Sequence, residues 1–395
     1  MIGRDAALVT GSRFMQNALG FALSIAVVHR FGLAGVGLLT IASVGVVIQA
    51  SLLTFGLPYV LARSDASIGQ RNALGATMAG VAQLVALPVG AALGVLYGHD
   101  AREAAVIALL SLGGPYFAQS SIAEALLVLQ GKTGRIALST LGGLLGLAVA
   151  YLVAEDFLVF ATILAIGRFS GLACLFASLP CERFGAATLR EHLRRGTRFL
   201  LPDMLGLLAE QASVAIVSML TSRAELGVFG LCRQLLTVGD TPLWSRLVAW
   251  YPRLCAEPAA ARTLERQMLA RGLGFGAALA ALAPALGTWV FHSPEVVRLG
   301  PLMMCCVPFR YVAGTAEMTL RAMSDVAAVH RVTLLRCALV ALLPIGLWCG
   351  GLTGAVLAMI LQIALVAVLA RRMVAAASRR HTDGSSVYSA VGVSS

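Results

Sequence analysis

The sequence predicts an all-α polytopic membrane protein with about twelve transmembrane helices in two parallel six-helix repeats. The chain has 395 residues, of which 58% are hydrophobic and only 12% charged. Soluble proteins average about 45–50% apolar and about 25% charged residues. Apolar runs of about 20 residues, the length that crosses a bilayer, recur along the whole chain. The mean hydropathy of +0.85 agrees with a chain that lies mostly in lipid.

The apolar runs place the predicted helices in chain order. They cover residues 8–29, 35–61, 73–97, 104–129, 136–154, 157–179, 199–221, 226–251, 269–291, 299–322, 332–349 and 352–370. These helices leave only short turns, a linker and a tail, so no room remains for a soluble catalytic domain. The predicted domains are an N-terminal lobe (1–179), a basic cytoplasmic linker (180–198), a C-terminal lobe (199–370) and a disordered cytoplasmic tail (371–395).

An internal repeat supports the division into two halves. Residues 11–15 read Gly-Ser-Arg-Phe-Met and residues 196–200 read Gly-Thr-Arg-Phe-Leu. A Gly-rich turn follows in each copy, at 35–39 and 227–231. Because six helices precede the second copy, both halves start on the same side of the membrane, which predicts parallel rather than inverted repeats.

The arginines and lysines test this layout, because they gather in every second connection. The basic connections hold Arg4, Arg63, Arg71, Lys132, Arg135, Arg183, Arg190, Arg194, Arg195, Arg253, Arg262, Arg266, Arg331, Arg371, Arg372, Arg379 and Arg380. The intervening turns hold only Arg30, Arg102, Arg223 and Arg298, and three of these have an acid nearby in sequence: Glu103, Glu225 and Glu295. The positive-inside rule therefore predicts that both termini are cytoplasmic.

The same rule accounts for most of the net charge of +11. Nucleic-acid binding has no folded basic domain to support it. The linker, with its Arg-rich and loosely amphipathic sequence, is expected either to lie on the anionic cytoplasmic leaflet or to be a solvated loop.

Several predicted helices carry polar stripes that an apolar environment does not explain. Within each stripe the spacing alternates between three and four residues, which puts the stripe on one helix face. The stripes are Arg13, Asn17, Gly20 and Ser24; Asp203, Gly206, Glu210 and Ser213; Arg233, Thr237, Asp240 and Trp244; and Arg310, Gly314, Glu317 and Arg321. An Arg or Asp at the bilayer centre costs about 2.5–3.5 kcal/mol, so each of these charges needs a partner or water.

These residues, together with two more arginines, define the candidate site. The predicted substrate-binding residues of a cavity are Arg13, Asn17, Arg168, Arg233, Arg246 and Arg310, with Glu210, Asp240 and Glu317 as ion-coupling or ion-pairing acids. Several guanidinium groups suit a substrate that carries phosphates, which Arg grips with two hydrogen bonds. The alternative is ion pairs that only orient helices: Arg233 with Asp240, Arg310 with Glu317, or Glu317 with Arg321.

Signals for an enzyme, a metal or a cofactor are poor. Residues 131–133 read Gly-Lys-Thr like the end of a P-loop, but position 126 is Leu where that motif requires Gly. The six His residues are dispersed and show no metal-ligand spacing, and the cysteines are scattered within helices. We therefore expect a transporter with no cofactor and no metal rather than an enzyme.

The motifs resemble the multidrug/oligosaccharidyl-lipid/polysaccharide (MOP) exporter superfamily, and within it the Wzx-like O-antigen and polysaccharide flippases. The resemblance rests on 12–14 (Ser-Arg-Phe), 30–37 (Arg-Phe-Gly-Leu-Ala-Gly-Val-Gly), 55–58 (Phe-Gly-Leu-Pro), 225–229 (Glu-Leu-Gly-Val-Phe) and 250–252 (Trp-Tyr-Pro). It implies a V-shaped pair of lobes around a cationic cavity in the bacterial inner membrane. It also implies alternating access that moves an undecaprenyl-diphosphate-linked oligosaccharide for surface polysaccharide assembly.

The implied partners are the lipid-linked oligosaccharide, membrane lipids, and the polymerase and chain-length machinery of polysaccharide assembly. Two alternatives stay open. A cation-coupled drug exporter of the same superfamily would favour an acidic cavity rather than an Arg-rich one. A membrane-embedded polysaccharide polymerase or ligase would favour a long outer loop, and the sequence predicts none.

Overall fold

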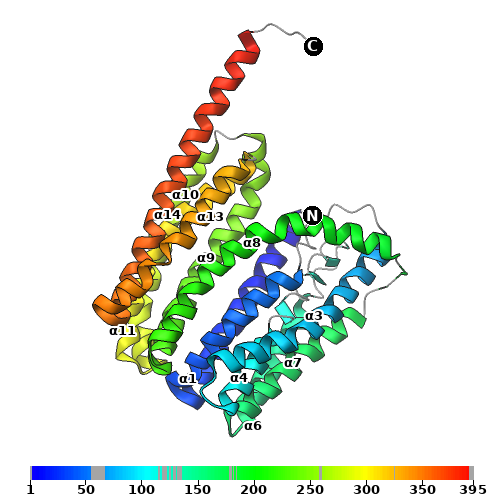
Figure 1. The fold of residues 1–395 in the computed structure, drawn as a ribbon, viewed down its shortest axis with the longest axis vertical. Coiled ribbons are helices and arrows are strands. Elements are labelled where there is room, and N and C mark those ends of the chain that lie inside the picture. Colours follow the sequence, from blue (N-terminus) through cyan, green and yellow to red (C-terminus); the bar gives the residue numbers. More distant parts are fainter. Residues whose placement is uncertain are drawn as a thin grey trace. The chain divides into compact units, whose positions relative to one another are not determined.

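The protein is all-helical, as the sequence predicts, and no strand occurs in the part that the structure covers. The computed structural model describes residues 2–54, 67–113, 116–117, 122–123, 126–127, 130, 136–177, 180, 182–183, 185–257, 260–323 and 325–390. By its contacts the chain divides into two compact units, unit 1 (Met1–Gly230) and unit 2 (Leu231–Ser395). Figure 1 shows the helices of both units.

Unit 1 contains the helices up to the start of α9. They are α1 (Ile2–Thr54), α3 (Ile68–Tyr97), α4 (Ala101–Ser111), α6 (Ile136–Val153), α7 (Phe157–Ala177) and α8 (Ala186–Leu220), and α9 (Arg223–Ala256) begins in this unit. The helices α6 and α7 lie side by side, as do α3 and α4 (Figure 1).

Unit 2 contains the rest of α9 and the C-terminal helices. They are α10 (Ala261–Trp289), α11 (Pro294–Met304), α12 (Cys306–Ala322), α13 (Val326–Leu339) and α14 (Leu342–Ala390). Pro308 lacks the N–H that would bond to Met304, and the predicted helix 299–322 accordingly divides at Cys305 into α11 and α12.

Four segments among the described residues are long and apolar enough to cross a membrane by length and composition. They are Ala18–Ala50, Ala261–Trp289, Pro294–Ala322 and Leu342–Ser378. Shorter apolar helices occur at Pro88–Tyr97, Leu141–Val153, Phe157–Ser170 and Met204–Leu220.

Two glycine positions break long helices into the pairs that the sequence predicts. In α1 the backbone leaves the helix at Gly32, whose φ of 71° is in the left-handed region that glycine tolerates. This break separates the predicted helices 8–29 and 35–61. In α14 the break is at Gly350 and Gly351, the latter with φ 55°, between the predicted helices 332–349 and 352–370. Both breaks lie within two or three residues of the predicted ends.

The predicted helix 332–349 is divided in the structure, because α13 ends at Leu339 and α14 begins at Leu342. Two further predicted segments also differ from the described backbone. The predicted linker 180–198 is helical from Ala186 onward and runs without a break into α8. The predicted disordered tail 371–395 is helical up to Ala390, and residues 391–395 lie outside the described residues. Helix-forming alanines continue α14, and Ala370, Met373, Val374 and Ala377 extend a buried cluster that includes Leu320 and Val332. Burial of small apolar side chains on one face therefore extends the helix past its predicted end.

The boundary between the units also differs from the predicted linker, because it lies within α9 after Gly230. The start of α9 packs closely on α1: a Cβ built on Gly227 would lie 3.0 Å from the carbonyl carbon of Leu33, and one on Gly230 would lie 3.0 Å from Cβ of Thr40. Glycine permits this approach of two backbones. These contacts join the Gly-rich turn of the second predicted copy to the first copy.

Contacts within unit 1 agree with the predicted alternation of connections. At one end, Asp156 in the α6–α7 turn pairs with Arg102 at 3.2 Å, and Arg30 Nε donates to the Ala154 carbonyl at 2.9 Å. At the α3 start, Asn72 Nδ2 donates to the Pro180 carbonyl at 2.7 Å. The Arg-poor turns thus meet one another, and two basic connections meet one another. Which end faces the cytoplasm stays a prediction.

Candidate functional site

The predicted site residues fall in both units, so each unit is described by itself. The side chains of Arg13 and Asn17 in α1 lie outside the described residues, as do those of Asp203 and Trp244. The described candidates are Arg168 and Glu210 in unit 1 and Arg233, Asp240, Arg246, Arg310 and Glu317 in unit 2.

Arg168 in α7 is buried inside unit 1, with 8% of its surface exposed. Its guanidinium carbon lies 5.9 Å from the centre of the Tyr116 ring, and its Nε has no hydrogen-bond partner. Among the residues that the structure describes, no carboxylate pairs with it. A cation–π contact is worth about 0.5–2 kcal/mol, whereas an Arg at the bilayer centre costs about 2.5–3.5 kcal/mol. The Tyr116 ring therefore offsets only part of the cost of this buried charge.

Gln49 in α1 is a second buried polar residue in unit 1, and the sequence reading did not single it out. It is 1% exposed, and neither its Nε2 nor its Oε1 has a hydrogen-bond partner. The sequence signal that could have identified Gln49 is a single Gln inside the apolar run 35–61. A buried amide without a partner costs free energy, as a buried charge does.

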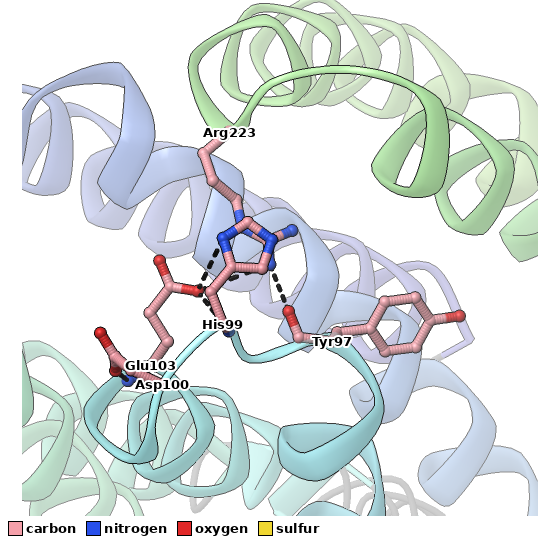
Figure 2. Close-up of polar contacts among 5 residues, drawn as sticks. All are labelled: Tyr97, His99, Asp100, Glu103 and Arg223. Atoms are coloured by element: carbon pink, nitrogen blue, oxygen red, sulfur yellow. Dashed lines mark hydrogen bonds and ion pairs between the residues drawn. The ribbon is translucent and has the colours of Figure 1, made fainter.

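The Arg-poor turns of unit 1 contain a polar cluster at the start of α9, shown in Figure 2. The Arg223 guanidinium donates to the Tyr97 carbonyl and lies 3.5 Å from Oε2 of Glu103. Glu103 also accepts from the backbone N–H of His99 at 3.0 Å, while Asp100 caps α4 by accepting from the Glu103 N–H at 2.8 Å.

This cluster corrects the pairing that sequence proximity suggests. Glu103 follows Arg102 directly, yet it binds Arg223, and Arg102 binds Asp156 instead. Glu225, two residues after Arg223, accepts from the Ser222 N–H at 2.9 Å and caps α9. Turns far apart in the chain supply the partners, so spacing alone could not identify them.

Asp240 and Arg310 form the central ion pair of unit 2. Arg310 reaches Asp240 with two parallel contacts, Nε to Oδ1 at 2.9 Å and Nη2 to Oδ2 at 2.5 Å. Asp240 is 6% exposed, and next to it Tyr311 donates its hydroxyl to the Gly239 carbonyl at 2.8 Å. The two acid–base stripes of α9 and α12 thus face each other, and Asp240 binds Arg310 across helices, whereas sequence spacing had set it beside Arg233.

Glu317 is held by Arg336 of α13, a residue that the sequence reading did not single out. Neither predicted partner, Arg310 nor Arg321, is the one that the structure gives Glu317. Arg336 sits in an apolar run, so the cost argument applied to the other arginines would have identified it. The acids Asp240 and Glu317 are therefore ion-paired in this structure, whereas Glu210 is a half-buried residue of α8.

Arg246 in α9 stands against an aromatic ring rather than an acid. Its guanidinium carbon lies 5.6 Å from the Trp250 ring centre, and that of Arg253 lies 5.0 Å from the same ring. Arg253 has a carboxylate 3.6 Å away in Glu257, but Arg246 pairs with no carboxylate among the described residues. Arg246, Trp250 and Arg253 form what we call the α9 ladder, a ring with a guanidinium on each neighbouring turn. Arg233, one of the predicted residues on the same helix, is half-buried.

No group of three or more metal-ligating side chains occurs in the described part of the chain. The α9 ladder places positive charge next to the Trp250 ring. The acids Asp240 and Glu317 of unit 2 are neutralised by arginines. Such a surface can bind phosphate oxygens and stack against a sugar ring.

No protein-family model matches the sequence, and no curated protein matches it. Solved structures do match over nearly the whole chain. An inward-facing multidrug resistance MATE family transporter of the MOP superfamily is 14% identical, with 93% of this chain and 96% of that chain covered and a TM-score of 0.67. The lipid II flippase MurJ, in an inward closed conformation, is 11% identical, with 92% and 86% covered and a TM-score of 0.68.

A third structure is a MOP superfamily transporter from Pyrococcus furiosus, for which a binding pocket of reverse polarity suggests a different function. It is 15% identical, with 95% of this chain and 96% of that chain covered and a TM-score of 0.68. These neighbours are transporters and flippases rather than enzymes. Together with the apolar helices, they indicate a multi-pass membrane protein with the fold of the MOP superfamily transporters.

Proposed function

We propose that this protein is a flippase that moves an undecaprenyl-diphosphate-linked oligosaccharide across the bacterial inner membrane for the assembly of a surface polysaccharide. Both termini are cytoplasmic in this proposal, and a polysaccharide polymerase with its chain-length machinery takes up the flipped product. The fold supports the role of a transporter, and the charged side chains of unit 2 favour an anionic substrate.

The observation that carries the proposal is the unneutralised guanidinium of Arg246 in the α9 ladder. The two predicted coupling acids of unit 2, Asp240 and Glu317, already have arginine partners, so they present little negative charge to a cationic substrate. Among the described residues, Arg246 has the Trp250 ring as its neighbour and no carboxylate. A diphosphate linked to a sugar carries the groups that complement this ladder, namely anionic oxygens for the guanidinium groups and a sugar face for the ring.

The second candidate is a cation-coupled drug exporter, because several similar structures are multidrug transporters. Binding of a lipophilic cation requires a carboxylate that is not already neutralised. Asp240 and Glu317 do not meet this requirement, because an arginine neutralises each of them. The transporter with a binding pocket of reverse polarity indicates that this fold accommodates more than one kind of pocket.

The test uses purified full-length protein in proteoliposomes that contain a fluorescent polyprenyl-diphosphate oligosaccharide. Flipping is measured by the loss of probe that an external quencher reaches. We expect wild-type protein to flip the lipid, Arg246→Ala and Arg233→Ala to slow flipping at least about tenfold, and Lys at either position to restore it only partly, because a single ammonium cannot form the two-bond contact. Arg262→Ala is the matched control, since Arg262 is an exposed arginine of α10.

The same vesicles are tested with a cationic dye. Dye transport without lipid flipping would replace the flippase by a drug exporter. If Arg246→Ala flips the lipid at the wild-type rate, the α9 ladder is not part of the substrate site. A pH or Na⁺ gradient imposed across the vesicles shows whether transport is ion-coupled, and Glu210 is then the first acid to replace.

A further inference from the structure

We infer that unit 1 contains a buried site for a compact inorganic anion of about the size of chloride, formed by Arg168 and Gln49. This site is separate from the α9 ladder of unit 2 and does not depend on the proposed substrate. Its basis is the pair of almost fully buried polar side chains in unit 1 whose bonding groups lack protein partners.

The guanidinium of Arg168 lies where α1, α7 and residue 113 meet. A Cβ built on Gly113 would lie 2.9 Å from Nη1 of Arg168 and 3.2 Å from Cγ2 of Val46. The missing side chain at Gly113 therefore provides the room that the guanidinium occupies. Tyr116, one turn further along, covers the guanidinium with its ring.

The register of α1 against residues 111–113 indicates that Gln49 lies at the same level of unit 1 as Arg168. A Cβ built on Gly45 would lie 2.8 Å from Oγ of Ser111, and Val46 is the neighbour of Gly113. Gln49 lies one helical turn beyond Val46 on α1, and Tyr116, three residues after Gly113, lies beside Arg168. From this register we place the Gln49 amide in the same layer of unit 1 as Arg168 Nε, and neither group has a hydrogen-bond partner among the described residues.

The chemistry of this layer favours an anion over water. Arg stays protonated under all ordinary conditions, so burial cannot be relieved by loss of a proton. Water would satisfy the hydrogen bonds, but it would leave the positive charge uncompensated. A bound anion accepts from Arg168 Nε and Gln49 Nε2 and neutralises the charge in one step.

The burial limits the size of the ligand. Arg168 is 8% and Gln49 1% exposed, so their surroundings are closed to a headgroup that carries a lipid chain. We therefore assign the site to a free halide-sized anion. A phosphate oxygen of a lipid headgroup has related chemistry, and the experiment separates the two.

The experiment measures thermal unfolding of the full-length protein in detergent, with sodium gluconate replaced stepwise by sodium chloride at constant ionic strength. A ligand that binds only the folded state raises Tm in a saturable way. We expect a rise of about 2–4 °C for wild type, no rise for Arg168→Leu, and a reduced rise for Gln49→Leu. The control Arg102→Leu, which removes an exposed arginine of unit 1, keeps the full rise.

A second measurement keeps the inference testable if Arg168→Leu does not fold. Crystals of wild-type protein grown in bromide should show an anomalous peak within hydrogen-bonding distance of Arg168 Nε. A chloride effect that persists in Arg168→Leu, water alone at the position, or stabilisation by lipid phosphate but not by halide would each overturn the assignment. Loss of lipid flipping in the reconstituted assay bears on the α9 ladder and leaves this result unaffected.

Discussion

Removing Asp240 should destabilise unit 2 far more than removing an ordinary surface acid. The carboxylate is 6% exposed, and Arg310 meets it with two contacts of 2.9 and 2.5 Å. Breaking a fully buried pair costs about 3–5 kcal/mol, and breaking an exposed pair costs about 0.2–1 kcal/mol. Because the Arg310 side chain is 24% exposed, we expect Asp240→Ala to cost about 2–4 kcal/mol.

The measurement is the free energy of unfolding in mixed micelles, with SDS as the denaturant. A double-mutant cycle then compares Asp240→Leu, Arg310→Met and the combination of these two changes. Since the combination leaves no unpaired charge, it should recover most of the loss, with a coupling energy of about 1.5–3 kcal/mol. Glu257→Ala is the control, because Glu257 makes an exposed ion pair.

Two results would refute this reasoning. One is a loss below about 1 kcal/mol for Asp240→Ala, the range of an exposed pair. The other is simple additivity of the two single changes, which would mean that the two side chains do not act as a pair. Either result would return Asp240 to the role of a proton-binding or Na⁺-binding acid.

Three further predictions concern other parts of the chain. Reporter enzymes fused after Arg135 and after Glu155 should report opposite sides of the membrane, and the same side for both would refute the parallel-repeat topology. Gly227→Ala should lower stability by about 1–3 kcal/mol through overpacking against α1, while Gly274→Ala, where a Cβ has nothing within 4 Å, should not; equal effects would contradict the close approach. The pKa of Asp156 is lowered below its usual 3.8 by the backbone N–H groups of Val159 and Leu158 and by the Arg102 charge. The Tm deficit of Asp156→Ala should therefore be full at neutral pH and vanish as the pH falls through that lowered pKa. A deficit that persists at lower pH would exclude the carboxylate as its cause.

The sequence by itself determined the fold class. Hydropathy of this strength leaves only a membrane-spanning helical chain, because every backbone polar group in lipid must bond within its own helix. Single residues fixed the sharpest local features as well: Gly32 and Gly351 adopt positive φ at the breaks in α1 and α14. The hydropathy pattern missed the helical residues before 199 and after 371, and after 371 the burial of Ala377 in the cluster around Leu320 continues the helix.

Only the tertiary structure decided which charges meet. Asp240 and Glu317 were identified from the sequence because an intramembrane acid needs a partner, but their partners, Arg310 and Arg336, come from other helices. Spacing along one helix measures distance within that helix, and it carries no information on the rotation and depth of its neighbours. For the same reason, the inferred anion site depends on how α1 packs within unit 1, because Gln49 and Arg168 are far apart in the sequence.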